Sequence, residues 1–269
     1  MFEISQYSLK GKIAIVTGGG RGIGKAIALG FAKAGAEVVI TSRKIDDLEA
    51  TAEEIKTFGG KAFPFQAHLG KMEGINKMVG TVIDRFGKID ILVNNAGASP
   101  DMQSVLDSDE RLWDTIMNLN MKGLYFTSQS VAKVMKKQGG GKIINTASVD
   151  GIIPEQGVSV YSISKAGVRM ITKAFALELA PFNIQVNSIV PGLITTKMLN
   201  SHWSHLPPEE AEKQRNALAQ ANPMRRIGEP DEMVGAAIYF ASEASSFTTG
   251  TEIVVDGGFL LKGTLPSVS

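Results

Sequence analysis

The chain of 269 residues is 43% hydrophobic and 20% charged, enough to bury a sizeable core in one α/β domain or two small domains. Its 28 basic and 27 acidic residues leave a formal net charge of +1, so the basic excess of a typical nucleic-acid-binding protein is missing. There is no cysteine, which excludes disulfides, zinc sites with Cys ligands and thiol nucleophiles.

Short, almost continuously apolar segments alternate with longer amphipathic ones along the chain. Such apolar segments are typical of strands that helices cover on both faces. The predicted strands cover 12–17, 37–41, 61–66, 89–93, 142–147, 184–190 and 252–255. The repeated strand–helix–strand order predicts a doubly wound parallel sheet of seven strands in a single domain over 8–260. Residues 1–7 and 261–269 are expected to be terminal extensions.

Residues 193–220 interrupt this alternation with two prolines and a polar stretch, and we expect them to form a short lid over the substrate. No apolar run approaches the ~18 residues that a membrane span needs. The first residues lack the basic and apolar segments of a signal peptide. We therefore expect a cytoplasmic enzyme without a membrane or nucleic-acid partner.

The first predicted strand runs directly into a glycine-rich turn and then into a helix. Glycines let a backbone approach a pyrophosphate closely, and a helix N-terminus offers free N–H groups to it. The turn has the spacing G-x-x-x-G-x-G, which differs from the commoner G-x-G-x-x-G. It predicts a dinucleotide site formed by Gly18, Arg21, Gly22, Ile23 and Gly24.

The end of the second predicted strand indicates which dinucleotide is bound. An acidic residue there would bind the ribose 2′-hydroxyl of NAD, whereas an arginine accommodates the 2′-phosphate of NADP. Here Ser42 and Arg43 follow the strand, and the first carboxylate is Asp46. A guanidinium can make charge-assisted bonds to a phosphate, so we predict a preference for NADP(H) over NAD(H).

Several polar residues stand at or near the ends of predicted strands and on one helix. Tyr161 and Lys165 are four apart and therefore share a helix face. Ser148 follows the fifth strand, Asn120 lies in a preceding helix, and Asn94-Asn95-Ala96-Gly97 closes the fourth strand. The carboxyl edge of a doubly wound sheet is where such folds bind ligands.

Together these motifs resemble the short-chain dehydrogenase/reductase family over about residues 8–260, and more weakly its NADP-dependent carbonyl-reductase branch. The resemblance implies a Rossmann fold and reversible hydride transfer between NAD(P)H and a carbonyl or secondary alcohol. It implies that Tyr161 is the acid/base, that Lys165 stabilises its anion and holds the nicotinamide ribose, and that Ser148 binds the substrate oxygen. Asn120 would anchor a water that relays protons from Lys165.

The resemblance also implies further contacts to the cofactor. These would come from Asn95, Ala96, Gly97, Pro191, Gly192, Ile194 and Thr196. Where the family often has Asp-Val after the third strand, this chain has His68-Leu69. The backbone of Leu69 could still meet the adenine, whereas a side-chain contact from His68 is in doubt.

Four other functions compete with a general carbonyl reductase. A metal site is disfavoured because only three histidines exist, and His202 and His205 have no ligand cluster around them. A non-catalytic NADP-binding regulator would typically lose the tyrosine or the lysine.

A 3-oxoacyl-[acyl-carrier-protein] reductase is the leading alternative. Its acidic carrier would dock near 177–183, which is apolar or acidic here. Isomerases among the family's extended relatives normally carry a longer substrate domain.

The substrate itself is not specified by these motifs. Three segments, 99–103, 150–158 and 198–206, are expected to line the pocket. Within them Met102, Ile152, Met198 and Trp203 predict a partly apolar cavity and a medium-sized ketone or aldehyde. The family resemblance also implies a homotetramer, packed through helices around 105–136 and 158–182 and through the C-terminal strand.

Overall fold

The computed structural model describes residues 3–98, 102–201, 203 and 206–262. Its centre is one all-parallel sheet of seven strands in the order β3-β2-β1-β4-β5-β6-β7. The strands are β1 Ile13–Thr17, β2 Glu37–Ser42, β3 Lys61–Gln66, β4 Ile91–Asn94, β5 Gly141–Thr146, β6 Ile184–Pro191 and β7 Glu252–Val255. The predicted fold class, a doubly wound α/β sheet, is confirmed.

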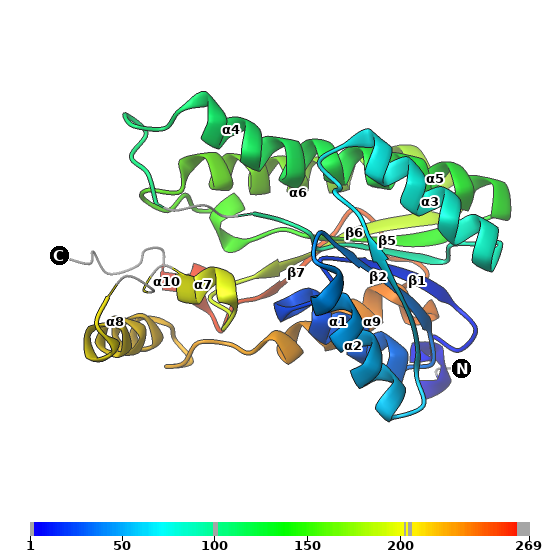
Figure 1. Cartoon of the computed structure of the whole chain (residues 1–269), viewed down its shortest axis with the longest axis horizontal. Coiled ribbons are helices and arrows are strands. Elements are labelled where there is room, and N and C mark those ends of the chain that lie inside the picture. The colour runs from blue at the N-terminus through cyan, green and yellow to red at the C-terminus, as the bar shows by residue number, and fades with distance from the viewer. Residues whose placement is uncertain (1–2, 99–101, 202, 204–205, 263–269) are drawn as a thin grey trace.

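Helices cover both faces of the sheet (Figure 1). One layer contains α1 Gly22–Lys33, α2 Ile45–Thr57 and α9 Val234–Ala241; the other contains α3 Met72–Phe86, α4 Glu110–Met117, α5 Leu124–Gln138 and α6 Ser159–Leu179. Each layer of helices packs against one face of the sheet and buries a separate apolar core there. Phe31 and Phe240 are buried in the first core, and Met78 and Met135 in the second. This double burial explains why the central strands are apolar on both faces.

The predicted strands are all present, with small differences at their ends. The fourth begins at Ile91 rather than at 89, and the backbone of Ile89 bonds to the Gln138 side chain at 3.2 and 2.6 Å instead of to a strand. The fifth spans 141–146, one residue earlier than predicted. These shifts change no pairing.

The segment after β6 is irregular, as its sequence predicts. It holds the short helix α7 Lys197–Ser201 and then α8 Pro208–Ala221, and a last helix, α10 Phe259–Lys262, follows β7. Ile194 pairs with Gly228 in an isolated bridge, which ties the start of the segment to the chain before α9. In Figure 1, α7 lies on the same side of the molecule as the ends of β6 and β7. The expected lid role of 193–220 stays a prediction, and residues 202, 204 and 205 lie outside the described part.

The strand order reverses beside β1, which lies between β2 and β4. From this point the crossovers diverge to opposite sides, and a crevice opens beyond the carboxyl ends of the strands. The sheet topology therefore places one candidate site at the ends of β1, β4 and β5.

Candidate active site

A cleft of about 500 Å³ lies at this carboxyl edge. It extends from the glycine-rich turn between β1 and α1, past the ends of β2 and β4, to the end of β5 and helix α6. Most of the site residues expected from the sequence line it: Gly18, Arg21, Gly22, Ile23, Ser42, Arg43, Leu69, Asn95, Ala96, Gly97, Ser148, Tyr161, Lys165, Pro191, Gly192, Ile194, Thr196 and Met198.

The glycine-rich turn is shaped by positive φ angles and by a tight approach of β4. Gly18 and Gly22 have φ of +68° and +53°, which an L side chain rarely adopts. Thr17 fixes the neighbouring turn, because its Oγ1 accepts the N–H groups of both Asn95 and Ala96 at 2.9 Å. The two turns therefore form one wall of the cleft.

Gly24 has a different place from the one expected. It does not line the cleft; it packs behind the turn, where a Cβ would collide with the carbonyl of Gly18 and the amide of Asn95. The glycine is required because the turn after β1 and the turn after β4 leave no room for a side chain there. Its effect on a dinucleotide is thus indirect.

The end of the cleft beside β2 is basic. Arg21, Arg43 and Lys44 line it, and Arg43 is held at its backbone by a hydrogen bond of 2.8 Å from the Gln66 side chain to its carbonyl oxygen. Asp47, in the first turn of α2, also lines this end and is a counter-charge that the sequence analysis did not weigh. The basic groups still outnumber it.

The residues present fit a dinucleotide. The hydroxyls of Thr41 and Thr146 are buried at the cleft and make no hydrogen bond within the described part of the chain. Glycines at 18, 20 and 22 remove side chains from the wall that a pyrophosphate would approach, at the N-terminus of α1.

His68 was expected to be a cofactor residue, and its side chain does not reach the cleft. It is exposed, and its Nδ1 accepts the N–H of Gly70 at 3.2 Å, so it caps the turn after β3 instead. Leu69 is buried and does line the cleft.

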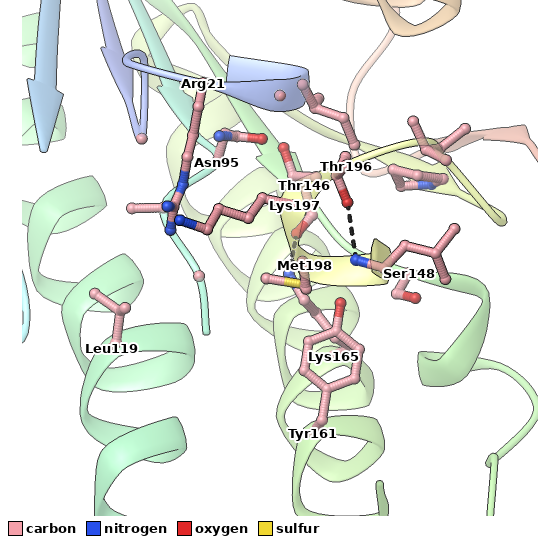
Figure 2. Close-up of a pocket in the computed structure, with 18 of the residues that line it drawn as sticks. Arg21, Asn95, Leu119, Thr146, Ser148, Tyr161, Lys165, Thr196, Lys197 and Met198 are labelled. Atoms are coloured by element: carbon pink, nitrogen blue, oxygen red, sulfur yellow. Dashed lines mark hydrogen bonds between the residues drawn. The ribbon is translucent and has the colours of Figure 1, made fainter. Parts of the chain in front are cut away.

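Ser148, Tyr161 and Lys165 meet at the other end of the cleft (Figure 2). Ser148 follows β5, and the other two are one turn apart on α6. Lys165 is buried and donates a hydrogen bond of 2.8 Å from Nζ to the carbonyl of Thr146; the same Nζ lies 5.5 Å from the centre of the Tyr161 ring. One strand end and one helix face thus assemble all three groups.

Asn120 lies outside the cleft lining but next to it. It is buried in a turn of π-helix, Asn118–Gly123, between α4 and α5, the kind of distortion that often marks a functional site. Its amide donates to the carbonyl of Ala98 at 2.9 Å and to Ser164 Oγ at 3.1 Å, while its Oδ1 accepts the N–H of Ala98 at 2.8 Å. These bonds hold the turn after β4 against α6.

Two carboxylates at this end were not singled out from the sequence. Asp150 and Glu155 line the cleft together with Ser148 and Tyr161. In the sequence these two residues are distinguished only by their position between Ser148 and Tyr161. No known motif assigns a function to carboxylates at that spacing. Lys197, from α7, also lines the cleft and was missed for the same reason.

Burial and these carboxylates control the ionisation of the site. Burial first, and then the charge of Asp150, raise the pKa of Glu155 from 4.5 to about 7. Burial also raises the pKa of Asp150, which the hydrogen bond from Ser148 opposes. Burial lowers the pKa of Lys165 to about 8, so it is mainly protonated at neutral pH.

Tyr161 is a neutral phenol under these conditions. Burial, followed by the charge of Asp150, raises its pKa, and only the hydrogen bond with Ser148 lowers it. We expected Lys165 to stabilise the phenolate, and its Nζ lies 5.5 Å from the centre of the Tyr161 ring. A neutral phenol can donate a proton to a developing oxyanion.

The expected apolar pocket is mostly formed by other residues. Met198 lines the cleft, whereas Met102, Ile152 and Trp203 do not: Met102 lies beside Gly157, and Ile152 is 36% exposed. Apolar lining near the catalytic end comes instead from Val149, Val158, Leu193 and Leu199. Side-chain direction, which the sequence does not give, decides this difference.

A metal site finds no support in the described residues, where no three His, Asp or Glu side chains gather as ligands. His202 and His205 lie outside the described residues. No helix of the described chain is long and apolar enough to cross a bilayer.

The fold and the site together define the class. A doubly wound parallel sheet with a dinucleotide-type turn, and a tyrosine, a lysine and a serine facing the same cleft, is a dinucleotide-dependent oxidoreductase. A family model described as "Enoyl-(Acyl carrier protein) reductase" matches residues 18–260. The chain belongs to the short-chain dehydrogenase/reductase family.

Individual relatives are similar over nearly their whole length. The 3-oxoacyl-[acyl-carrier-protein] reductase FabG of Thermotoga maritima is 38% identical, covering 94% of this chain and 99% of the relative. The 2-dehydro-3-deoxy-D-gluconate 5-dehydrogenase of Escherichia coli is also 38% identical, covering 96% and 99%. A gluconate 5-dehydrogenase from Burkholderia cenocepacia, solved with NADP and tartrate, has a TM-score of 0.88 at 33% identity, covering 96% and 98%. The protein is therefore an NAD(P)H-dependent oxidoreductase that acts on carbonyl and alcohol groups.

Proposed function

We propose that this protein is an NADP(H)-preferring reductase of small, uncharged ketones or aldehydes, with Tyr161 as the acid/base. The observation that carries the proposal is the polarity of one continuous cleft: Arg21, Arg43 and Lys44 at one end, and Ser148 and Tyr161 at the other. The first end has the charge that a 2′-phosphate needs, and the second has the groups that a carbonyl oxygen needs.

In the proposed reaction, bound NADPH supplies the hydride that adds to the carbonyl carbon. Tyr161 gives its phenol proton to the carbonyl oxygen as negative charge develops there. Ser148 orients that oxygen by a hydrogen bond. Lys165, charged at neutral pH because its pKa is about 8, holds the nicotinamide ribose and attracts the phenolate that remains. Asn120, beside Lys165, would hold the water through which the proton is restored.

The preference for NADP(H) is supported by the charges beside β2. Arg43 and Lys44 directly follow the strand on the cleft, and the nearest acidic side chain lining the cleft is Asp47, on α2. A relative of similar fold was solved with NADP bound. A carboxylate at the end of the strand, which would repel a 2′-phosphate, is absent from the sequence at 42–44.

The preference for an uncharged substrate is supported by Asp150 and Glu155. Both line the catalytic end, where the buried Lys165 directs a hydrogen bond to the carbonyl of Thr146. A substrate carboxylate next to the reacting carbon would meet two acidic groups in a partly buried cleft, where repulsion is weakly screened. Apolar lining from Val149, Val158 and Leu199 would receive the rest of the substrate.

A second candidate is a 3-oxoacyl-[acyl-carrier-protein] reductase, favoured by the similarity to the Thermotoga maritima protein. Its thioester has no carboxylate beside the reacting carbonyl and would tolerate the same acidic groups. The expected carrier contact at 177–183 is not basic: Leu177 is exposed and Glu178 is acidic. We rank this candidate second for that reason.

We further propose an oligomeric state, a domain organisation and a cellular compartment for the protein. Exposed apolar side chains on α4, α5 and α6, namely Trp113, Tyr125, Met170 and Leu177, support a homotetramer packed through these helices. Residues 8–260 would form the catalytic domain of each protomer, with 193–220 as a substrate lid, in the cytoplasm. A monomeric mass by light scattering would contradict the oligomer.

A substrate panel tests the function directly. NADPH and NADH oxidation are followed with pairs of ketones that differ only in a carboxylate or its methyl ester, together with 3-oxoacyl thioesters. We expect higher kcat/KM with NADPH than with NADH, and with the ester than with the acid. Preference for the acids would contradict the substrate class, and thioesters far above all other compounds would establish the second candidate.

A further inference from the structure

The hydroxyl of Ser148 makes two hydrogen bonds to Asp150, besides the one that it shares with the neutral phenol of Tyr161. The Ser148 Oγ lies 3.2 Å from the carboxylate oxygen Oδ2 of Asp150, to which it donates, and it accepts the Asp150 N–H, also at 3.2 Å. A serine hydroxyl carries a single proton, and an ionised carboxylate can only accept. While Asp150 is ionised, the proton of Ser148 therefore points at Asp150.

This arrangement conflicts with the role that a carbonyl substrate requires of Ser148. A carbonyl oxygen only accepts hydrogen bonds, so the serine must donate its proton to it. With that proton bonded to Asp150, Ser148 offers a lone pair to the rest of the cleft. Ser148 can donate only when the bond to Asp150 is released, and protonation of Asp150 releases it, because a carboxylic acid can donate to the serine oxygen.

We propose that Asp150 is a positioning residue for the reductase, whose carboxylate holds the hydroxyl proton of Ser148 and whose protonation frees that proton for the substrate oxygen. The inference rests on the proposed function. Asp150 itself exchanges no proton with the substrate: the hydride adds to the carbonyl carbon, the Tyr161 proton goes to the oxygen, and Ser148 keeps its proton. Asp150 takes its own proton from solvent.

The charged groups around Asp150 determine when it ionises. Glu155, from the loop before α6, and Tyr161 and Lys165, from α6, are the titratable groups that interact with it. Burial raises the pKa of Asp150, and Lys165 and the bond from Ser148 oppose this rise. The carboxyl thus depends on Ser148 for the stability of its charge.

The guanidinium nearest to this turn is already engaged. Arg169 donates to Glu252 at 2.8 and 2.6 Å and to the carbonyl of Gly151 at 2.9 Å. It fixes the backbone of the turn and is paired with a different carboxylate. The hydroxyl of Ser148 therefore remains the side-chain donor to Asp150.

The same device makes the rate of reduction depend on pH. With Asp150 protonated, Ser148 donates, which suits a carbonyl and its developing oxyanion. With Asp150 ionised, Ser148 offers only a lone pair, which suits the O–H of an alcohol. The rate of reduction is thus expected to fall as the pH rises through the pKa of Asp150, while the equilibrium between ketone and alcohol is unchanged.

The test compares Asp150→Asn and Asp150→Ala with the wild-type enzyme. The reductive kcat/KM is measured with the best neutral ketone from about pH 5 to about pH 9, where catalytic acids and bases are commonly seen. Removing Asp150 also shifts the pKa values of Glu155 and Lys165, so the part of the effect that passes through Ser148 is isolated by repeating the comparison without the serine hydroxyl. We expect this ratio to be about one at the acid end and to rise to about tenfold at the alkaline end, the effect of one charge-assisted hydrogen bond. The alanine variant keeps the backbone N–H bond to Ser148.

A Ser148→Ala background separates positioning from a general effect of charge. Residual reduction is followed in single turnovers with enzyme in excess. If Asp150 acts through the serine, adding Asp150→Asn to this background leaves the pH dependence unchanged. Asp84→Asn, which removes an exposed carboxylate from α3, is the control for net charge.

Three results would overturn the inference. These are a ratio that does not change with pH, a uniform loss of activity at all pH values, and a pH-dependent gain that persists in the Ser148→Ala background. A wild-type enzyme that binds NADPH and reduces no carbonyl would remove the proposed function as well, and this failure is recognised before any variant is made.

Discussion

The two ends of the cleft are built in different ways. The nucleotide end is formed by backbone and glycines: the turn after β1, the turn after β4 bonded to Thr17, and the basic residues that follow β2. The catalytic end is formed by side chains from β5, α6 and the loop between them, and it contains Asp150 and Glu155. Backbone geometry can serve many enzymes unchanged, whereas side chains such as these can set what each enzyme reduces.

The largest effect is expected at the catalytic end. Tyr161→Phe removes the proton donor, so kcat for reduction should fall by about 10³-fold or more, while the Kd for NADPH changes little. Stopped-flow measurement of NADPH oxidation gives the first quantity, and fluorescence titration gives the second. Tyr125→Phe, a similar change on the exposed face of α5, is the control. Substantial turnover by the Tyr161 variant would mean that another group supplies the proton.

The nucleotide end should respond to a single methyl group. Gly24→Ala places a Cβ against the carbonyl of Gly18 and the amide of Asn95, so it should displace the turn and weaken NADPH binding by about 100-fold, or about 3 kcal/mol. Gly80→Ala is the matched control, because a Cβ at this exposed position of α3 meets nothing within 4 Å. The control should gain about 0.5–1 kcal/mol of folding stability from helix propensity. Equal effects of the two changes would contradict the account of the turn.

The charge of the nucleotide end is tested by Arg43→Asp. Replacing a cation by a carboxylate next to the proposed 2′-phosphate should lower the ratio of kcat/KM for NADPH to that for NADH by about 10–100-fold. Lys77→Asp, an equal charge reversal on the exposed surface of α3, should leave the ratio unchanged. An unchanged ratio in the Arg43 variant would show that the basic end does not recognise the phosphate.

The smallest effect concerns the ionisation of Glu155. Its pKa is about 7 in the folded chain against 4.5 for an ordinary glutamate, so the folded protein binds more protons and loses stability as pH rises through this interval. Glu155→Gln should remove this loss and raise the free energy of unfolding above pH 7 by roughly 1–3 kcal/mol. Urea unfolding at several pH values measures it, with the exposed Glu178→Gln as control. A variant less stable than the wild type at alkaline pH would contradict the acidic character of this end.

The contrast between the two ends also explains what the sequence could predict. The glycine spacing, the order of strands and the four-residue step from Tyr161 to Lys165 are local patterns with a fixed geometric meaning, so the fold and most of the cleft followed from them. Asn120 was recognised by a motif, but its bonds to Ala98 and Ser164 are contacts between elements that no spacing encodes.

The differences at the site share one physical cause. Met102, Ile152, His68 and Trp203 were assigned to the site by chain position, but they are not among the residues that line the cleft, and the His68 side chain bonds to a local turn. Asp150 and Glu155 were overlooked because the role of a carboxylate depends on its burial and neighbours. Direction and environment are set by packing across the sheet, which a local pattern does not contain.

If the two ends of the cleft cooperate in one hydride transfer, an isotope on the cofactor should reach the product. The enzyme is given NADPH deuterated at the reactive face of C4 of the nicotinamide and the best neutral ketone, and the product alcohol is analysed by mass spectrometry. We expect one deuterium on the carbinol carbon with the wild type and none above background with Tyr161→Phe. Tight binding of NADPH without deuterium in any product would contradict this hydride transfer and would favour a non-catalytic NADP-binding protein.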